Sequence, residues 1–249
     1  MVDISPLNKL KSAIQYVGFH YIVCVKAKPS NLDTEIYFGN KGYGFDSIAS
    51  LDRQYLHWEF QRWASNVVLR DLIEYFSIFL FDIYDDLYKE IVKHKIEDKF
   101  PISPIQFERY GIENQLNYLA EKFLIDSRWI ELIVDYNRVR NCYAHRAGFV
   151  GNKDLTNGTK LTVKWLKHTV TQTETAINQT MPVTGVMNDL MRLEHIHGNM
   201  GVECDVQTEE RSFYVGDLIS FKPDEVFDII LTFVTVGQVF SMLDLTILK

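Results

Sequence analysis

The stretch Asp135-Tyr-Asn-Arg-Val-Arg-Asn-Cys-Tyr-Ala-His-Arg-Ala-Gly148 lies at the end of a strongly apolar helical pattern, in a chain of 249 residues with a formal net charge of −7. Five cationic or hydrogen-bonding side chains occupy nine positions of this stretch: Arg138, Arg140, Asn141, His145 and Arg146. One interpretation is structural, because basic side chains in a last turn complement the helix dipole by roughly 0.3–1 kcal/mol each, and Gly148 then ends the helix. The other is a phosphate site, in which arginine holds the charge and histidine transfers a proton.

The helical geometry of the stretch separates its two most reactive side chains. Residues advance by about 100° in an α-helix, so Asn137, Asn141 and His145 share one face. Arg140 then lies about 140° from His145 around the helix. One helix alone does not converge this pair, so a functional site requires a second surface, such as a symmetry-related copy.

Arg140-Asn-Cys-Tyr-Ala-His145 resembles the Arg-Asn-x-x-x-His form of the Arg-x4–6-His signature of HEPN domains, which glycine often follows, as Gly148 does here. Arg138 to His145 also fits the looser signature. The chain departs from the forms regulated by a nucleotidyltransferase, which carry tyrosine where it has Ala147. The segment Arg192 to His197 has the same spacing but no comparable helix end.

The resemblance implies a metal-independent endoribonuclease of a prokaryotic toxin–antitoxin, abortive-infection or antiviral defence system. Arg140 would bind the scissile phosphate, His145 would act as general acid or base for attack by the ribose 2′-hydroxyl, and Asn141 would orient nearby groups. We expect Arg138 and Arg146 to contact RNA. The expected partners are RNA, a second copy with its motif across the interface, and an antitoxin protein, with no metal and no cofactor.

Two other functions stay open. A catalytically silent HEPN-like dimer would bind RNA or a protein through the same cleft. A helical scaffold would use the basic turn only to cap a helix, and would not dimerise through the motif face.

Composition favours a globular protein in the cytoplasm. The hydrophobic and charged fractions, 47% and 24%, are ordinary. Cys24, Cys142 and Cys204 are few and far apart, which indicates a reduced compartment without a disulfide framework or thiolate zinc site. The longest apolar runs, Leu72–Tyr84 and Ile229–Phe240, are too short to span a membrane. Because the net charge is negative, any phosphate-binding surface must be local.

The expected fold class is mainly α, a HEPN-like helical bundle with a β-containing insertion before the C-terminal helix. Residues 1–150 form the bundle, 151–222 the insertion and 223–249 a helix that packs back on the bundle. Capping and periodicity predict these helices: one that begins at Ser5-Pro6, one long bent helix or two helices from Asp46 to Lys99, Ile105–Leu124 after a cap at Ser103, Arg128–Ala147 after a cap at Asp126 or Ser127, and Pro223–Leu248.

The insertion is expected to contain both strands and a helix. Leu161–Thr171 is rich in β-branched residues and predicts a strand. Val202–Val206 and Ser212–Phe221 predict a hairpin that turns at Thr208–Arg211, and Thr184–His197 predicts a short helix.

The remaining motifs favour structural interpretations. His195 and His197, with Glu194 and Cys204, are a weak metal-ligand pattern, and a solvated loop is favoured. Lys28–Gly44 is expected to be a loop, and its glycines at 39–44 a plain turn rather than a phosphate cradle. The aromatic residues in Tyr55–Trp63 have helical spacing, which favours core packing over base stacking. Three charged side chains on the same predicted helix form either an exposed face or an ion pair at a central cleft: Arg70, Asp71 and Glu74.

Overall fold

The computed structural model describes residues 5–26, 35–38, 41–44, 53–172 and 202–243. The helices are α1 (Pro6–Lys26), α2 (Arg53–His94), α3 (Pro104–Glu108), α4 (Ile112–Phe123), α5 (Ser127–Arg146) and α7 (Pro223–Ser241), with 3-10 turns at Glu97–Lys99 and Asn152–Asp154. The strands are β1 (Glu35–Phe38), β2 (Lys41–Gly44), β3 (Leu161–Gln172) and β4 (Val202–Phe213), in two antiparallel pairs. The described fold is therefore mainly α, as predicted.

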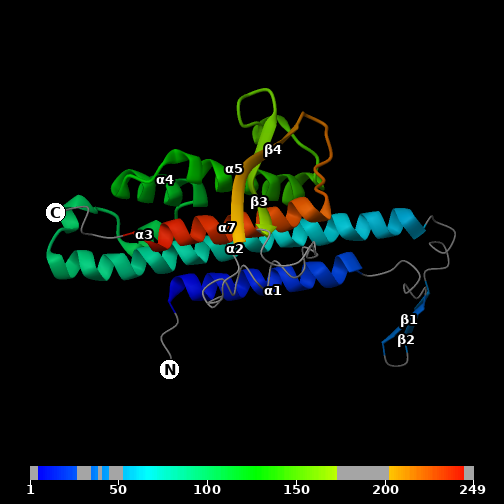
Figure 1. Cartoon of the computed structure of the whole chain (residues 1–249), viewed down its shortest axis with the longest axis horizontal. Helices are drawn as coiled ribbons and strands as arrows, with labels where there is room; N and C mark the ends of the chain where they lie inside the picture. Colours follow the sequence, from blue (N-terminus) through cyan, green and yellow to red (C-terminus); the bar gives the residue numbers. More distant parts are fainter. Residues whose placement is uncertain (1–4, 27–34, 39–40, 45–52, 173–201, 244–249) are drawn as a thin grey trace.

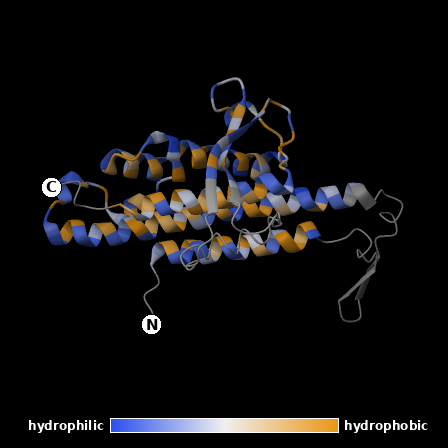
Figure 2. Ribbon diagram, in the orientation of Figure 1, coloured by the Kyte–Doolittle hydropathy of each residue, from blue (hydrophilic) through white to orange (hydrophobic). Residues whose placement is uncertain are grey.

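The long helix α2 is the centre of the fold (Figure 1). It contacts α1, α5 and α7, and α7 also lies against α1. Figure 2 shows hydrophobic residues concentrated where these helices face one another. Helix α7 approaches α1 at Gly237, where a Cβ would lie 2.5 Å from Leu10 Cδ2, so a larger residue there would force the Leu10 side chain to move. The aromatic ring of Phe76 packs edge-on against Phe233 and Phe240, which joins α2 to α7 in one core.

Several predicted helix starts are confirmed by their hydrogen bonds. Ser103 forms a capping box with Gln106, in which each side chain bonds the other residue's backbone N–H. Asp126 accepts from the backbone N–H of Arg128 over 3.0 Å. At the first helix, Ser5 Oγ accepts from the backbone N–H of Asn8.

Three of the predicted elements need correction. The predicted helix Ile105–Leu124 is in fact α3 and α4, separated at Gly111, whose extended backbone precedes the first residue of α4. The predicted Lys28–Gly44 loop contains the β1–β2 hairpin. Between the two alternatives for Asp46–Lys99, the described part is one continuous helix, α2. At the other end of the chain, α7 stops at Ser241 instead of Leu248, and residues 244–249 lie outside the described ranges.

The second hairpin also differs from its prediction. The strand at Leu161 is confirmed, but its partner β4 runs unbroken through Thr208–Arg211, the predicted turn, which pairs with 163–166 of β3. Pairing with the β3 residues Val163, Trp165 and Leu166, which are buried, outweighs the polar, turn-like composition of these four residues. The predicted helix Thr184–His197 lies outside the described residues.

The described part of the 151–222 segment shares the core of the bundle. Strand β3 packs on α5 and α7, and the backbone N–H of Leu166 donates to Thr232 Oγ1 over 2.8 Å. The ring of Trp165 is buried edge-on against Phe221. The base of the hairpin is thus fixed to the helices, and positions the chain that follows α5.

The expectation that Tyr55–Trp63 belongs to the core is wrong for three of its aromatic residues. The exposed fractions are 52% for Tyr55, 43% for Trp58 and 55% for Trp63. Further along α2, Phe76 and Phe79 are buried as predicted. Figure 1 shows that the first turns of α2, which begin at Arg53 and hold Tyr55 and Trp58, extend beyond the ends of α1 and α7. Trp63 is exposed for another reason: its neighbours Ala64 and Ser65 are buried and Ser65 contacts Tyr21 of α1, so Trp63 faces away from the packed side of the helix. Helical spacing identifies a face but does not show whether a neighbour reaches it.

No helix within the described ranges is both long enough and apolar enough to cross a membrane.

Candidate functional site

Helix α5 holds the predicted site residues and is anchored along its inner face. Leu132, Ile133 and Val139 are buried in the core, and the Tyr136 hydroxyl donates to the Lys164 carbonyl of β3 over 3.0 Å. The outer face of the last two turns is left with Asn141 half-buried and His145 exposed. The helix is regular through Arg146, so the predicted separation of Arg140 and His145 around its axis is retained.

The helix ends through a left-handed turn. Ala147 has φ 51° and Gly148 has φ 92°, and the backbone N–H of Gly148 donates to the Cys142 carbonyl over 3.0 Å. A Cβ at Gly148 would lie 2.9 Å from Tyr143 Cε1. Both the backbone conformation and the close approach of Tyr143 therefore require glycine at this position.

Arg140 contacts α2 through an ion pair. Its Nη2 donates to Glu74 Oε1 over 2.6 Å, and its Nη1 lies 3.5 Å from Asn141 Oδ1. The two charged side chains are 36% and 53% exposed, so the pair is at the surface. Of the three charged residues predicted on α2, Glu74 is the one that reaches the motif, while Arg70 and Asp71 pair with each other.

His145 is exposed one turn beyond Arg140, and among the described residues it has no hydrogen-bond or ion-pair partner. Two positions later, the Ala147 carbonyl accepts from Arg62 Nη1 of α2 over 3.3 Å. Since Glu74 contacts Arg140 and Arg62 contacts Ala147, α2 and α5 run antiparallel, and α2 flanks the whole motif. Arg62 carries no local sequence signal of this contact, because its partner, the Ala147 carbonyl, lies 85 positions away in the chain.

Arg138 and Arg146, the predicted RNA contacts, take part in intramolecular ion pairs. Arg138 pairs with the buried carboxylate of Asp135 and Arg146 with the buried carboxylate of Asp154. Thr156 also donates to Asp135, so these bonds tie the loop after α5 to the helix. Burial raises the pKa of Asp135, against the opposing effect of its hydrogen bonds from Thr156 and Arg138. The geometry of these two ion pairs favours a structural role for Arg138 and Arg146. RNA contact by either arginine stays a prediction.

The neighbouring thiol is not a reactive group. Cys142 is buried on the inner face of α5. Burial, reinforced by a hydrogen bond with Asp154, raises its pKa to about 12. A thiol of this pKa is protonated near neutral pH and is a poor nucleophile.

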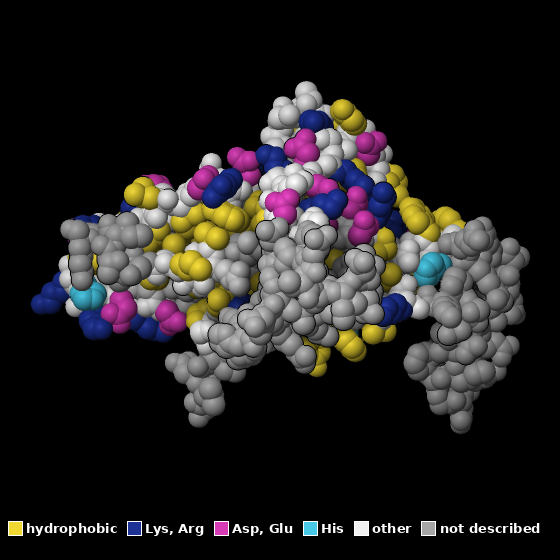
Figure 3. Space-filling view, viewed as in Figure 1, with side chains coloured by type: hydrophobic (Ala, Val, Ile, Leu, Met, Phe, Trp, Pro, Cys, Tyr) yellow, Lys and Arg dark blue, Asp and Glu magenta, His cyan; other side chains and the backbone are white. Residues whose placement is uncertain are grey.

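The positive charge around the motif is locally balanced. Each of the following arginines has a carboxylate partner: Arg62 with Glu59, Arg70 with Asp71, Arg138 with Asp135, Arg140 with Glu74, and Arg146 with Asp154. On the face shown in Figure 3, basic and acidic side chains are interspersed rather than gathered by sign. A phosphate that binds Arg140 must therefore compete with the Glu74 carboxylate.

Metal ligands are not assembled in the part of the chain that the structure describes: no group of three or more His, Cys, Asp or Glu side chains there could hold an ion. The predicted weak pair His195 and His197 lies outside that part.

The chain matches no protein-family model, no curated protein and no solved structure. The resemblance to HEPN domains therefore rests on the motif residues alone, and these comparisons do not test it.

Proposed function

We propose that the protein is a metal-independent endoribonuclease of HEPN type that acts through Arg140 and His145. The observation that carries the proposal is that both side chains of the Arg-Asn-x-x-x-His sequence reach solvent on the last turns of one helix, with Asn141 between them. His145 is exposed, so a substrate hydroxyl can approach its ring.

In the proposed reaction, His145 accepts the proton of a ribose 2′-hydroxyl as that oxygen attacks the adjacent phosphorus. The P–O5′ bond breaks and water protonates the leaving oxygen, which gives a 2′,3′-cyclic phosphate and a 5′-hydroxyl, while His145 returns its proton to the resulting hydroxide. Arg140 stabilises the charge on the phosphoryl oxygens through its guanidinium. The need for a 2′-hydroxyl restricts the reaction to RNA.

The angular separation of Arg140 and His145 supports a dimeric arrangement. A second copy facing the first would place Arg140 of one chain opposite His145 of the other without unwinding α5. The resemblance of the motif to HEPN domains is the basis for expecting a cytoplasmic homodimer in a prokaryotic defence or toxin–antitoxin module.

One observation favours a second function, RNA or protein binding without cleavage. The 2.6 Å ion pair between Arg140 and Glu74 occupies part of the guanidinium that would hold the scissile phosphate. A binding protein tolerates this pair more readily than a catalyst, because only the catalyst must stabilise a transition state through Arg140.

The test is incubation of purified protein with mixed cellular RNA in the presence of a chelator, beside Arg140→Ala. We expect the wild type to cut and to leave cyclic-phosphate ends, and Arg140→Ala to lose at least a hundredfold in rate. Retained RNA binding with no cleavage by a folded wild type would favour the second function. Equal cleavage by the two proteins would exclude Arg140 from catalysis.

A further inference from the structure

The first turns of α2 carry an exposed aromatic surface that the bundle does not use. Tyr55 and Trp58 have ring centroids 6.0 Å apart at an interplanar angle of 34°, and both are substantially exposed. Single exposed apolar residues are ordinary on protein surfaces, but neighbouring aromatic rings on one helix face are a typical feature of a binding surface.

Arg62 joins this aromatic surface to the candidate site. It lies one turn after Trp58, and its guanidinium carbon is 5.8 Å from the centroid of the Trp58 ring. The same guanidinium donates to the Ala147 carbonyl, two positions after His145. The aromatic rings therefore adjoin the end of α5, where the proposed reaction takes place.

At Trp58 the nearest guanidinium is already engaged, which favours ring stacking over phosphate binding there. Arg62 donates to the Ala147 carbonyl and is paired with Glu59 over 2.6 Å. The faces of Tyr55 and Trp58 have no such conflict, because stacking depends on the ring and not on net charge.

The chemistry also selects the kind of ligand. Duplexes bury the faces of their bases, whereas unpaired RNA presents them for stacking. A stable protein interface needs about 800 Å² per partner, and here the charged Glu59 and Arg62 interrupt the aromatic surface within one turn. Stacking of a single base, in contrast, needs only one exposed aromatic ring.

We propose that Tyr55 and Trp58 form a stacking platform that selects unpaired RNA and delivers it to His145, an inference that rests on the function proposed above. Trp58 holds a base against its face, and Arg62 keeps the platform in place beside the end of α5.

The experiment measures binding separately from cleavage, with a fluorescent oligoribonucleotide whose 2′-hydroxyls are methylated so that it is not cut. Trp58→Ala is expected to raise the Kd about tenfold or more, which equals about 1.4 kcal/mol and is typical of one base stacked on an aromatic ring. Trp58→Phe should restore most of the affinity. A duplex of the same sequence should bind more weakly and be insensitive to Trp58→Ala.

Trp63→Ala is the matched control. Trp63 is similarly exposed on the same helix, but it lies about 100° around the axis from Arg62 and stacks on Phe60 at 5.7 Å. The Trp63→Ala variant should bind the oligoribonucleotide with the same Kd as the wild type. Unfolding midpoints of all variants establish that the fold is retained.

The outcomes separate this inference from the proposed function. If the wild type cuts unmodified RNA and Trp58→Ala binds the methylated oligoribonucleotide as tightly as the wild type, the stacking platform is wrong and the proposed nuclease function is retained. If wild type does not cut but Trp58→Ala loses binding, the platform stands without the nuclease. If Trp58→Ala changes the oligomeric state and leaves RNA binding unaffected, the surface is a protein interface and the inference is overturned.

Discussion

Arg140 of α5 and Glu74 of α2, separated by 66 positions in the chain, form an ion pair of 2.6 Å. The pair links the two antiparallel helices and sets the direction of the guanidinium. It also places a carboxylate where the proposed function requires a phosphate, so under that proposal the phosphate has to displace Glu74 from Arg140.

Glu74→Gln should therefore increase RNA affinity. Because the pair is exposed, its loss should change stability by less than about 1 kcal/mol, while the released guanidinium should lower the Kd for RNA about three- to tenfold. Asp71→Asn is the control, since it removes the same charge from the same helix at a carboxylate paired with Arg70. An equal gain of affinity in both variants, measured by fluorescence anisotropy, would mean that only net charge matters.

Arg146→Ala should destabilise the fold rather than weaken RNA binding directly. It leaves the Asp154 carboxylate, 4% exposed, without its cationic partner. Loss of one partner of a fully buried pair costs about 3–5 kcal/mol, and since Arg146 is itself 32% exposed we expect about 2–4 kcal/mol. The double variant Arg146→Ala, Asp154→Asn should recover part of the stability lost in Arg146→Ala.

Arg128→Ala serves as the comparison for Arg146→Ala, because its partner Asp126 is exposed and the cost should stay below about 1 kcal/mol. Urea unfolding measures all of these variants. If Arg146→Ala cost no more than Arg128→Ala, the structural role assigned to Arg146 would be wrong.

Gly148→Ala should also lower stability, by about 1–3 kcal/mol. The substitution forces a Cβ into a backbone with φ 92° and within 2.9 Å of the Tyr143 ring. Gly158→Ala is a useful comparison, since it has φ 78° but no atom within 4 Å of a built Cβ. The difference between their unfolding midpoints isolates the contact with Tyr143, and equal midpoints would show that the ring moves without cost.

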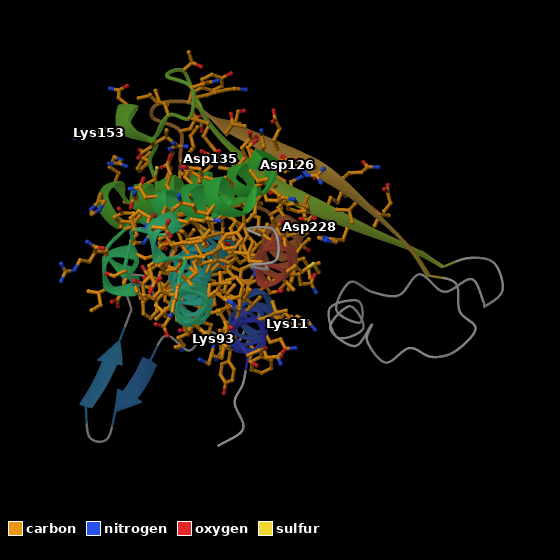
Figure 4. All side chains as sticks on the ribbon, turned by 90° about the vertical axis from the view of Figure 1, so that its left-hand side faces the viewer. Lys11, Lys93, Asp126, Asp135, Lys153 and Asp228 are labelled. Atoms are coloured by element: carbon orange, nitrogen blue, oxygen red, sulfur yellow. The ribbon has the colours of Figure 1, made fainter. Side chains whose placement is uncertain are left out.

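Asp228 should give the protein a distinctive pH dependence. Figure 4 shows this residue on α7, beside the hairpin. Burial raises its pKa to about 6, although the backbone N–H of His168 acts in the opposite direction. The folded state thus retains a proton that the unfolded state has lost, and stability falls as the pH rises from about 4 through 6.

Asp228→Asn removes that effect and can still accept the His168 N–H. The free energy of unfolding of this variant should equal that of the wild type below about pH 4 and exceed it above pH 6 by on the order of 1 kcal/mol. The difference is kept small because the Asp228 side chain is half-exposed. Urea unfolding at the two pH values measures the difference. A gain of equal size at both would contradict the raised pKa.

Local signals in the sequence were sufficient to predict several elements. Ser103 and Asp126 cap helices through bonds to residues within three positions, so the prediction needs no knowledge of the fold. Helix α5 and its end at Gly148 could be predicted for the same reason, because their signals also lie in neighbouring residues of the sequence. The break at Gly111 had a local signal too, the glycine itself, but the apolar periodicity on both sides obscured it.

Features that depend on distant contacts could not be predicted in this way. Thr208–Arg211 has the composition of a turn and becomes strand because β3 lies beside it. Trp58 has the spacing of a core residue but is exposed, because it belongs to the first turns of α2, which extend beyond α1 and α7 (Figure 1). At the candidate site, the motif residues were visible in the sequence, whereas the Arg62 and Glu74 contacts arise only when α2 packs against α5.

The most direct test of the proposed mechanism is the rate at which His145→Ala cuts a defined RNA in chelator. His94→Ala, another exposed histidine on a helix surface, is the matched control. The mechanism predicts that His145→Ala, folded and oligomeric as the wild type, loses at least a hundredfold in rate while His94→Ala retains full activity. An unchanged rate in His145→Ala would contradict the assignment of His145 as the group that transfers the proton.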